Sequence, residues 1–173
     1  GNKEDDLVKQ FNDIKEIMHN KWPNAKYIGY FQAHTNTYAS VPILKEKYET
    51  ILGIDNVVGL NIATRPDSIT DECLDYLEEL NKKTFLTIEL GLQSSNNKTL
   101  EFIKRGHNVE CFINTVKKLK EKGIFVVAHI INGLPYETEE DMLNTVKLLN
   151  DFKIDGIKIH MLHIIKDTAL ELL

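Results

Sequence analysis

One stretch of this sequence, IFVVAHIINGLPYET at residues 124–138, places a histidine inside an apolar run and a glycine turn directly after it. An apolar run rich in β-branched residues predicts a strand buried on both faces, as in parallel sheets. Ligands of α/β folds bind where such strands end and the following helices begin. There His129 could exchange hydrogen bonds with a ligand, and Gly133 could let the backbone approach it closely. This strand end is therefore the first candidate site.

Polar side chains also share one face of the other predicted strands. Side chains alternate across a strand, so Glu89 and Gln93 in TIELGLQS lie opposite leucine and isoleucine, and Lys158 lies opposite isoleucine. The residues assigned to this polar face are Gln32, Asn61, Glu89, Gln93, His129, Lys158 and His160. An unpaired polar group in a dry interior costs roughly 2–7 kcal/mol. The face therefore predicts an open, wide cavity that holds a large polar ligand. The alternative is a buried hydrogen-bonded network without a ligand.

The elements that carry these residues alternate between strands and helices. Strands are predicted at Lys26–Gln32, Val57–Ala63, Phe85–Gln93, Ile124–Ile131 and Gly156–Leu162. Helices are predicted at Glu4–Asn20, Val41–Leu52, Asp71–Lys83, Asn97–Arg105, Val109–Lys122 and Thr138–Phe152. A strand recurs about every 30 residues, so the chain reads as a run of βα units with a parallel sheet and right-handed crossovers. This α/β pattern fits either a doubly wound sheet or part of a barrel.

Composition limits the classes of protein that this chain can belong to. A length of 173 residues with 42% apolar and 27% charged residues suits one globular domain. The net charge of -5 gives no support to nucleic-acid binding through bulk charge. No apolar run reaches the roughly 18 residues of a membrane span, so we expect no membrane partner. Cys73 and Cys111 are expected to be free thiols, and we expect a cytoplasmic protein.

Four short strings, in this order along the chain, resemble the radical S-adenosylmethionine (SAM) superfamily. They are TRPD at Thr64–Asp67, TIELGLQS at Thr87–Ser94, KRGH at Lys104–His107 and HIINGLP at His129–Pro135. The nearest relatives are the Elongator catalytic subunit and oxygen-independent coproporphyrinogen III oxidase. With YFQAHTNTYA at residues 30–39, the whole pattern is most similar to an uncharacterised bacterial subfamily.

The resemblance implies a fold and a chemistry. The fold is a partial (β/α)6 TIM-like barrel with a parallel sheet that is open on one side. The chemistry is that of an oxidoreductase in which a [4Fe-4S] cluster, held by three cysteines in CxxxCxxC, donates one electron to SAM and releases a 5′-deoxyadenosyl radical. The cofactors implied are therefore SAM and the iron-sulfur cluster, while the protein binds and orients them.

The resemblance also assigns roles to individual residues. The turn at Gln32–Thr35 occupies the position whose backbone carbonyls hold the methionine amino group of SAM, although Ala33 and His34 replace the family's glycines. Arg105 matches an arginine that pairs with the methionine carboxylate, which a guanidinium fork can bind in a bidentate manner. Asn61 is included among the residues that bind the cofactor.

The remaining roles concern the nucleoside part of SAM and the substrate. Gln93 and Glu89 match polar residues that bind the ribose hydroxyls, and His129 matches a residue that contacts ribose or adenine. The backbone of Asn132 and Gly133 would lie against the adenine. Lys158 and His160 are assigned to face SAM or the substrate.

The sequence departs from the family at its most characteristic motif, because CxxxCxxC is absent. We therefore expect residues 1–173 to be a piece of the radical SAM core that holds strands 2 to 6 of the partial barrel. This piece alone should bind no cluster and catalyse nothing, whereas the full gene product should be an enzyme. Without its first neighbour, the strand at Lys26–Gln32 would form a sheet edge, and we expect association or a dimer through that edge.

Two other functions are weighed against this one. His129, His160 and His163 with Glu89 could ligate zinc in a metal-dependent barrel hydrolase. A non-catalytic binding module is the second alternative. The substrate is unknown, because a tRNA uridine and a tetrapyrrole are both compatible with the resemblance, and tRNA has no support in the composition.

Overall fold

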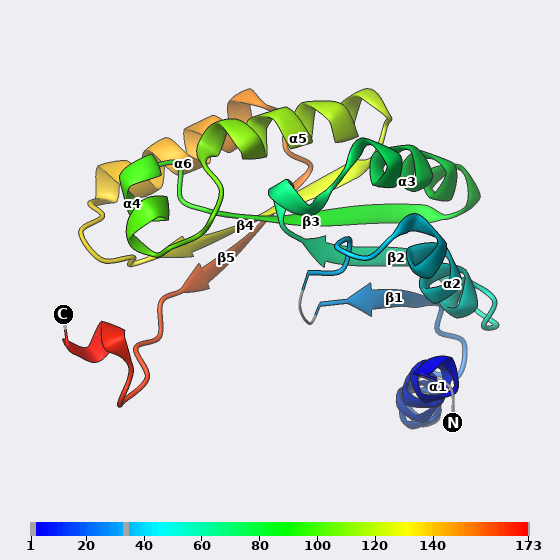
Figure 1. Cartoon of the computed structure of the whole chain (residues 1–173). Helices are drawn as coiled ribbons and strands as arrows, with labels where there is room; N and C mark the ends of the chain where they lie inside the picture. The colour runs from blue at the N-terminus through cyan, green and yellow to red at the C-terminus, as the bar shows by residue number, and fades with distance from the viewer. Residues whose placement is uncertain (1–2, 33–34, 173) are drawn as a thin grey trace.

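A computed structural model describes residues 3–32 and 35–172, and its centre is one curved sheet of five parallel strands (Figure 1). The strands are β1 (Tyr27–Phe31), β2 (Val57–Thr64), β3 (Phe85–Gln93), β4 (Phe125–Asn132) and β5 (Gly156–Met161). Their order in the sheet is their order in the chain, β1-β2-β3-β4-β5, and each pair is parallel. A sheet that grows in one direction only is part of a barrel, whereas a doubly wound sheet would reverse its order.

The helices after β1 connect the strands and cover the convex face of the sheet, while the helix before β1 lies beside its outer edge (Figure 1). They are α1 (Lys3–Lys21), α2 (Val41–Leu52), α3 (Asp71–Lys83), α4 (Asn97–Phe102), α5 (Val109–Glu121) and α6 (Glu139–Asp151), with short 3₁₀ turns η1 (Pro66–Ser68) and η2 (Ala169–Leu172). The predicted helix Asn97–Arg105 is too long. Its last turn ends because Lys104 and Gly106 adopt left-handed backbone conformations, with φ of 54° and 82°.

Side chains at the helix starts explain why the helices begin where they do. Thr70 caps α3, since its hydroxyl accepts a hydrogen bond from Cys73 N. Thr138 and Asp141 form the reciprocal capping box of α6, in which each side chain accepts from the backbone of the other residue. Both starts agree with the prediction from sequence.

The core lies between the sheet and these helices. The outward side chains of the three central strands are almost fully buried: Leu60, Ile62, Leu86, Ile88, Leu90, Leu92, Val126, Ala128 and Ile130. Their alternation with polar residues is the one predicted from sequence. The concave face carries the polar residues, so the predicted division of the two faces is confirmed for the central strands.

The outer face of β5 differs from this pattern. Ile159 is 59% exposed and Met161 is 61% exposed, although both point away from the concave face. Each earlier strand is followed by a helix that packs on the sheet, whereas the described residues after β5 hold only η2. The aliphatic side chains at the end of β5 are therefore not covered by a helix among the described residues.

Cys73 is buried and Cys111 is partly buried, and both are free thiols. None of the helices within residues 3–32 and 35–172 has the length and apolar character needed to cross a membrane.

Candidate functional site

A single carboxylate, that of Glu89 on β3, receives hydrogen bonds from all four other strands. Tyr30 Oη on β1 lies 2.8 Å away, Asn61 Nδ2 on β2 3.3 Å, and His129 Nε2 on β4 2.7 Å. Lys158 Nζ on β5 reaches both carboxylate oxygens, at 2.8 and 2.9 Å. The side chain of Glu89 is only 1% exposed. The predicted convergence of polar side chains on the concave face is therefore confirmed, and at Glu89 it takes the form of an internally paired network.

The register of the parallel strands brings these residues together. Ala63 lies beside Glu89, Gly91 beside His129, and His129 beside Lys158. Small residues at positions 63 and 91 leave room above the carboxylate. Because the sheet is curved, long side chains from β1 and β5 can reach the middle strand across the concave face.

Charge and burial set the protonation states of this network. Burial alone raises the pKa of Glu89, but hydrogen bonds from Lys158, Tyr30 and His129 outweigh it and hold the pKa of this carboxyl below its usual value. Burial lowers the pKa of His129, and this effect exceeds the opposing effect of Glu89. At neutral pH the network therefore contains one carboxylate, one ammonium and one neutral imidazole.

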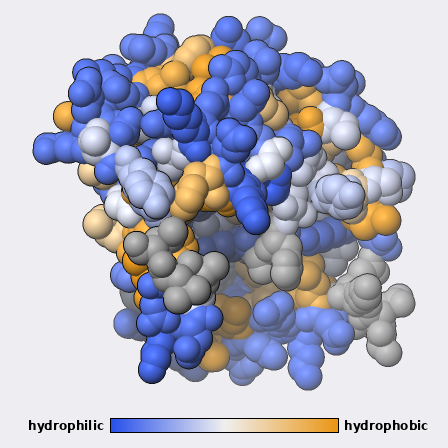
Figure 2. Space-filling view, turned by 60° about the vertical axis from the view of Figure 1, so that its left-hand side comes forward, coloured by the Kyte–Doolittle hydropathy of each residue, from blue (hydrophilic) through white to orange (hydrophobic). Residues whose placement is uncertain are grey.

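A cavity of about 360 Å³ opens beside the network, toward the carboxyl ends of the strands. Its lining residues are Gln32, Thr35, Ala63, Thr64, Arg65, Glu89, Gly91, Gln93, Arg105 and His129. Six of them, namely Gln32, Thr35, Glu89, Gln93, Arg105 and His129, are among the predicted site residues. Figure 2 brings this end of the sheet toward the viewer and shows a mostly hydrophilic face that is hollowed near its centre.

Arg105 is one of the two arginines that line the cavity, the other being Arg65. The Nη2 of Arg105 donates a hydrogen bond of 3.1 Å to the carbonyl oxygen of Gly91, while its Nε is buried and has no partner among the described residues. Burial, with Arg65 nearby, lowers the pKa of Arg105. A buried guanidinium with an unused donor fits a carboxylate ligand, because such a ligand would supply both the charge and the missing acceptor.

Gly91 makes this position of Arg105 sterically allowed. A methyl group at Gly91 would collide with Arg105 Nη2 and would lie 2.8 Å from Gln93 Nε2. Gln93 itself has a left-handed backbone with φ of 73°, where the pairing of β3 with β4 shifts register. The glycine and the irregular strand end together direct two polar side chains toward the cavity.

The turn after β1 forms one wall of the cavity, and its polar residues are more buried than the sequence suggested. Asn36 Nδ2 donates to the carbonyl oxygens of Phe31 and Ala63, at 2.9 and 3.0 Å. Thr37 Oγ1 lies 2.6 Å from Thr64 Oγ1. These bonds join the ends of β1 and β2. Ala33 and His34, which belong to the predicted contact with the amino group, lie outside the described residues.

Five of the predicted residues do not line this cavity: Asn61, Asn132, Gly133, Lys158 and His160. Asn132 ends β4, and its carbonyl oxygen accepts a hydrogen bond of 3.0 Å from Leu162 N. Gly133 forms the predicted turn with φ of 82°. His160 is exposed, and its ring centroid lies 5.2 Å from that of His129. Lys158 belongs to the network below the cavity.

Two residues that contribute to the site were not predicted from the sequence. Tyr30 shares its side of the strand with Gln32 but was not assigned to the site, because nothing in a strand pattern shows that its hydroxyl reaches Glu89. Arg65 lines the cavity and forms a bidentate pair with Asp67 at 2.9 and 2.7 Å. Its signal was the TRPD string at the end of β2.

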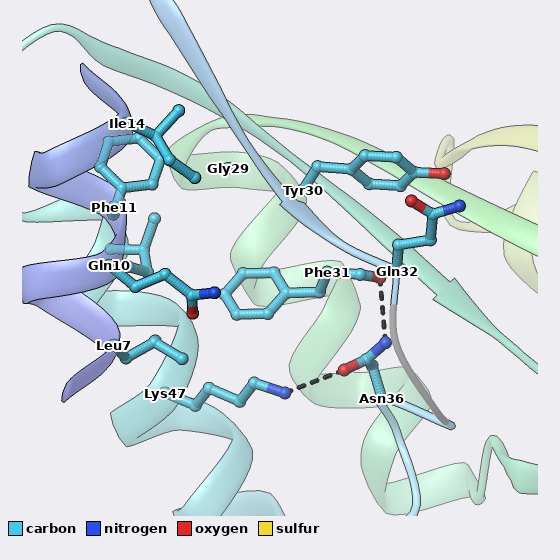
Figure 3. A pocket seen from close by; sticks show the side chains of 11 residues that line it. Leu7, Gln10, Phe11, Ile14, Gly29, Tyr30, Phe31, Gln32, Asn36 and Lys47 are labelled. Atoms are coloured by element: carbon cyan, nitrogen blue, oxygen red, sulfur yellow. Dashed lines mark hydrogen bonds between the residues drawn. The ribbon is translucent and has the colours of Figure 1, made fainter. Parts of the chain in front are cut away.

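A second cavity of about 640 Å³ lies between α1, β1 and α2 (Figure 3). Leu7, Phe11 and Ile14 of α1 form one wall, and on the other side Lys47 Nζ of α2 lies 4.7 Å from the centre of the Phe31 ring. Its lining is mainly apolar, and it lies at the outer edge of β1. It shares Tyr30 and Gln32 with the concave face.

The described residues contain no cluster of three or more histidine, cysteine, aspartate or glutamate side chains that could hold a metal ion. His129 directs Nε2 at Glu89, and His160 and His163 do not join them in a ligand set. The zinc site considered for a barrel hydrolase is therefore not formed by this part of the chain.

Comparison with known proteins identifies relatives in sequence and in fold. A model of the Radical SAM superfamily matches residues 3–149. Protein YtqA of Bacillus subtilis (strain 168) is 51% identical over 170 residues, which cover 98% of this chain and 53% of YtqA. The chain spans about half the length of the curated relatives that it matches first.

Two solved structures share the fold. Elp3 of the archaeon Methanocaldococcus infernus superposes with a TM-score of 0.78 at 24% identity, covering 96% of this chain and 44% of Elp3. Coproporphyrinogen III oxidase (HemN) from Escherichia coli, a radical SAM enzyme, superposes with a TM-score of 0.66 at 17% identity, covering 95% and 39%. The predicted partial TIM-like barrel is thereby confirmed.

Proposed function

Because this chain belongs to the Radical SAM superfamily, we propose that it forms the SAM-binding core of an enzyme that acts on its substrate by radical chemistry. One observation carries the assignment to the cavity above Glu89. The guanidinium-bearing side chain of Arg105 lines this cavity and keeps a buried Nε without a hydrogen-bond partner among the described residues, beside the amides of Gln32 and Gln93 and the imidazole of His129. A zwitterionic nucleoside such as SAM carries the carboxylate and the hydroxyl groups that these side chains would bind.

In this proposal, the lining residues bind different parts of SAM. Arg105 binds the methionine carboxylate, and Gln93 binds a ribose hydroxyl from the end of β3. Gln32 and Thr35 flank the methionine amino group, and His129 contacts the nucleoside. When bound, SAM supplies a 5′-deoxyadenosyl group that becomes a radical after one-electron cleavage. The part of the protein described here binds the cofactor, orients it and shields one side of it from water.

Other residues have supporting roles in this proposal. Asn61 and Glu89 hold the floor of the site, and the backbone at Asn132 and Gly133 flanks the adenine. Lys158 and His160 lie on the side from which a substrate would approach; His160 is exposed and able to contact it.

The residues of this chain do not fit the iron-sulfur cluster. A [4Fe-4S] cluster of this family needs three closely spaced cysteines, whereas the chain has two, and Cys73 and Cys111 lie on separate outer helices. We propose that the cluster ligands come from a part of the longer protein outside these 173 residues. Two facts support this: the relatives are about twice as long, and no described strand pairs with the outer edge of β1.

Two measurements test the proposal. The chain itself should bind SAM in isothermal titration calorimetry, and S-adenosylhomocysteine should compete with it. The full gene product, reconstituted anaerobically with iron and sulfide and then reduced, should release 5′-deoxyadenosine and methionine from SAM, while the 173-residue chain treated in the same way should release neither. A full-length protein that binds no cluster would instead support a binding module without catalysis.

A further inference from the structure

The carboxylate of Glu89 has no capacity left for a ligand. A carboxylate offers about four lone-pair sites, and Glu89 already accepts from Tyr30, Asn61, His129 and twice from Lys158. Its side chain is 1% exposed although it borders the cavity. Any contribution of Glu89 to ligand binding must therefore pass through one of its partners.

His129 is the partner that also reaches the cavity. Its Nε2 lies 2.7 Å from Glu89 Oε2, and an ionised carboxylate can only accept, so this nitrogen carries the proton. No hydrogen bond joins Nδ1 to any of the described residues. In a neutral ring with a proton on Nε2, Nδ1 holds a lone pair and can only accept a hydrogen bond.

Burial keeps the ring neutral, because it lowers the pKa of His129 by more than Glu89 raises it. Lys158 supplies the positive charge that Glu89 requires, at 2.8 Å. The His160 ring stacks near His129 at 5.2 Å, and Tyr30 faces the same carboxylate from β1. A second positive charge beside Lys158 would be repelled, which adds to the cost of burial.

We propose that Glu89 is a positioning residue: it contacts no ligand itself, but fixes His129 in the Nε2–H tautomer, so that Nδ1 accepts a hydrogen bond from a donor group of the ligand in the cavity. The identity of that donor rests on the proposed function. If SAM is the ligand, the donor is a hydroxyl or amino group of SAM. The site would then select ligands with a donor at this point and reject those that present an acceptor, because two acceptors facing each other repel.

The tautomer can be measured without any ligand. Histidine-selective ¹⁵N labelling and two-bond ¹H–¹⁵N spectra near pH 7.5 distinguish a protonated from an unprotonated ring nitrogen, and His129→Leu identifies the signal by its loss. We expect a fixed Nε2–H form in the wild type and an averaged pair of tautomers in Glu89→Leu. A proton on Nδ1, or a doubly protonated ring, in the wild type would overturn the proposal even if Glu89→Leu did not fold.

A double-mutant cycle tests whether Glu89 affects ligand binding through His129. Glu89→Leu and His129→Leu should each weaken SAM binding about tenfold, the effect of losing one hydrogen bond. The double variant should bind no more weakly than His129→Leu alone. Losses that multiply would show that Glu89 touches the ligand itself. If the wild type binds no SAM while its spectra show the fixed tautomer, the proposed function fails and the positioning role of Glu89 stands.

Discussion

Lys158 Nζ on β5 donates a hydrogen bond of 2.9 Å to Tyr30 Oη on β1, which joins the two edge strands of an open sheet across its concave face. The ammonium also lies 4.6 Å from the centre of the Tyr30 ring. Both groups bind Glu89 on the middle strand. One lysine therefore connects three strands across the concave face.

Replacing this lysine should destabilise the fold. Lys158→Met should lower the free energy of unfolding in urea by about 2 kcal/mol, the cost of removing a charged hydrogen-bond partner from a buried carboxylate. Tyr30→Phe, which removes one hydroxyl, should cost about 1 kcal/mol. Lys98→Met on the exposed surface of α4 is the matched control and should change little. A Lys158→Met variant as stable as this control would contradict the role of the network.

Acid should weaken the fold through Glu89. Its pKa is below the unfolded value of about 4.3, so the folded state holds fewer protons there than the unfolded chain. The stability that Glu89 contributes is fully present above that value and is lost as the pH falls through its folded pKa. The free energy of unfolding of Glu89→Gln should therefore depend less on pH below about pH 4.3. Equal slopes in both proteins would contradict the assignment.

His129 should affect the stability of the fold at a higher pH than Glu89 does. Its pKa is lowered in the fold, so the unfolded chain takes up a proton first as the pH falls below about 6.5. Stability should fall from that pH until the folded pKa of His129 is reached, and His129→Gln should flatten this part of the curve. Burial lowers the pKa of His107 in the same direction. His107→Gln should therefore remove a separate part of the slope, and the two effects should add.

Arg105 should decide the affinity for SAM. Arg105→Ala should weaken binding by roughly 1.5–3 kcal/mol, the range for a hydrogen bond to a charged group. Arg105→Lys should restore only part of it, because an ammonium lacks the planar fork of a guanidinium. Lys104→Ala, which removes the exposed neighbouring charge, is the control for long-range attraction. An unchanged dissociation constant in Arg105→Ala would remove this residue from the site.

Gly91→Ala offers a test that leaves the charge intact. The new methyl group would meet only the ends of two flexible side chains, those of Arg105 and Gln93. We therefore expect nearly wild-type thermal stability but SAM binding weakened about as much as in Arg105→Ala. Gly53→Ala, whose methyl group would make ordinary contacts at 3.5 Å, should leave binding unchanged. Wild-type affinity in Gly91→Ala would show that the position of Arg105 is unimportant.

The fold could be predicted from the sequence because two patterns, the alternation along the strands and the spacing of the βα units, agree. Alternation of leucine and isoleucine with polar residues in β3, and the spacing of βα units, are local patterns that the tertiary structure keeps. The bounds of α2, α3 and β3 were predicted without error. The end of α4 was missed because Lys104 adopts a left-handed conformation that glycine or asparagine usually signals.

The site was predictable to a smaller extent. Alternation shows which face a side chain occupies, so Glu89, His129 and Lys158 were placed together. It does not show how far a side chain reaches around a curved sheet, so the pairing of Tyr30 with Lys158 was missed. The burial of Asn36 and Thr37 was missed as well, since polar turn residues are exposed in most proteins. Two of their partners, the carbonyl oxygen of Ala63 and the hydroxyl of Thr64, lie 27 positions away in the sequence.

The five-strand network has a consequence for the order in which the chain acquires its structure. Glu89 loses access to water when β1, β2 and β4 assemble around it, yet the ammonium that balances it arrives with β5, 69 positions later. A nascent chain that ends before Lys158 would enclose the Glu89 carboxylate without a balancing charge. The cost of burying that charge opposes early closure of the sheet. Synthesis from the amino terminus therefore delivers the balancing ammonium last, after all the other partners of Glu89.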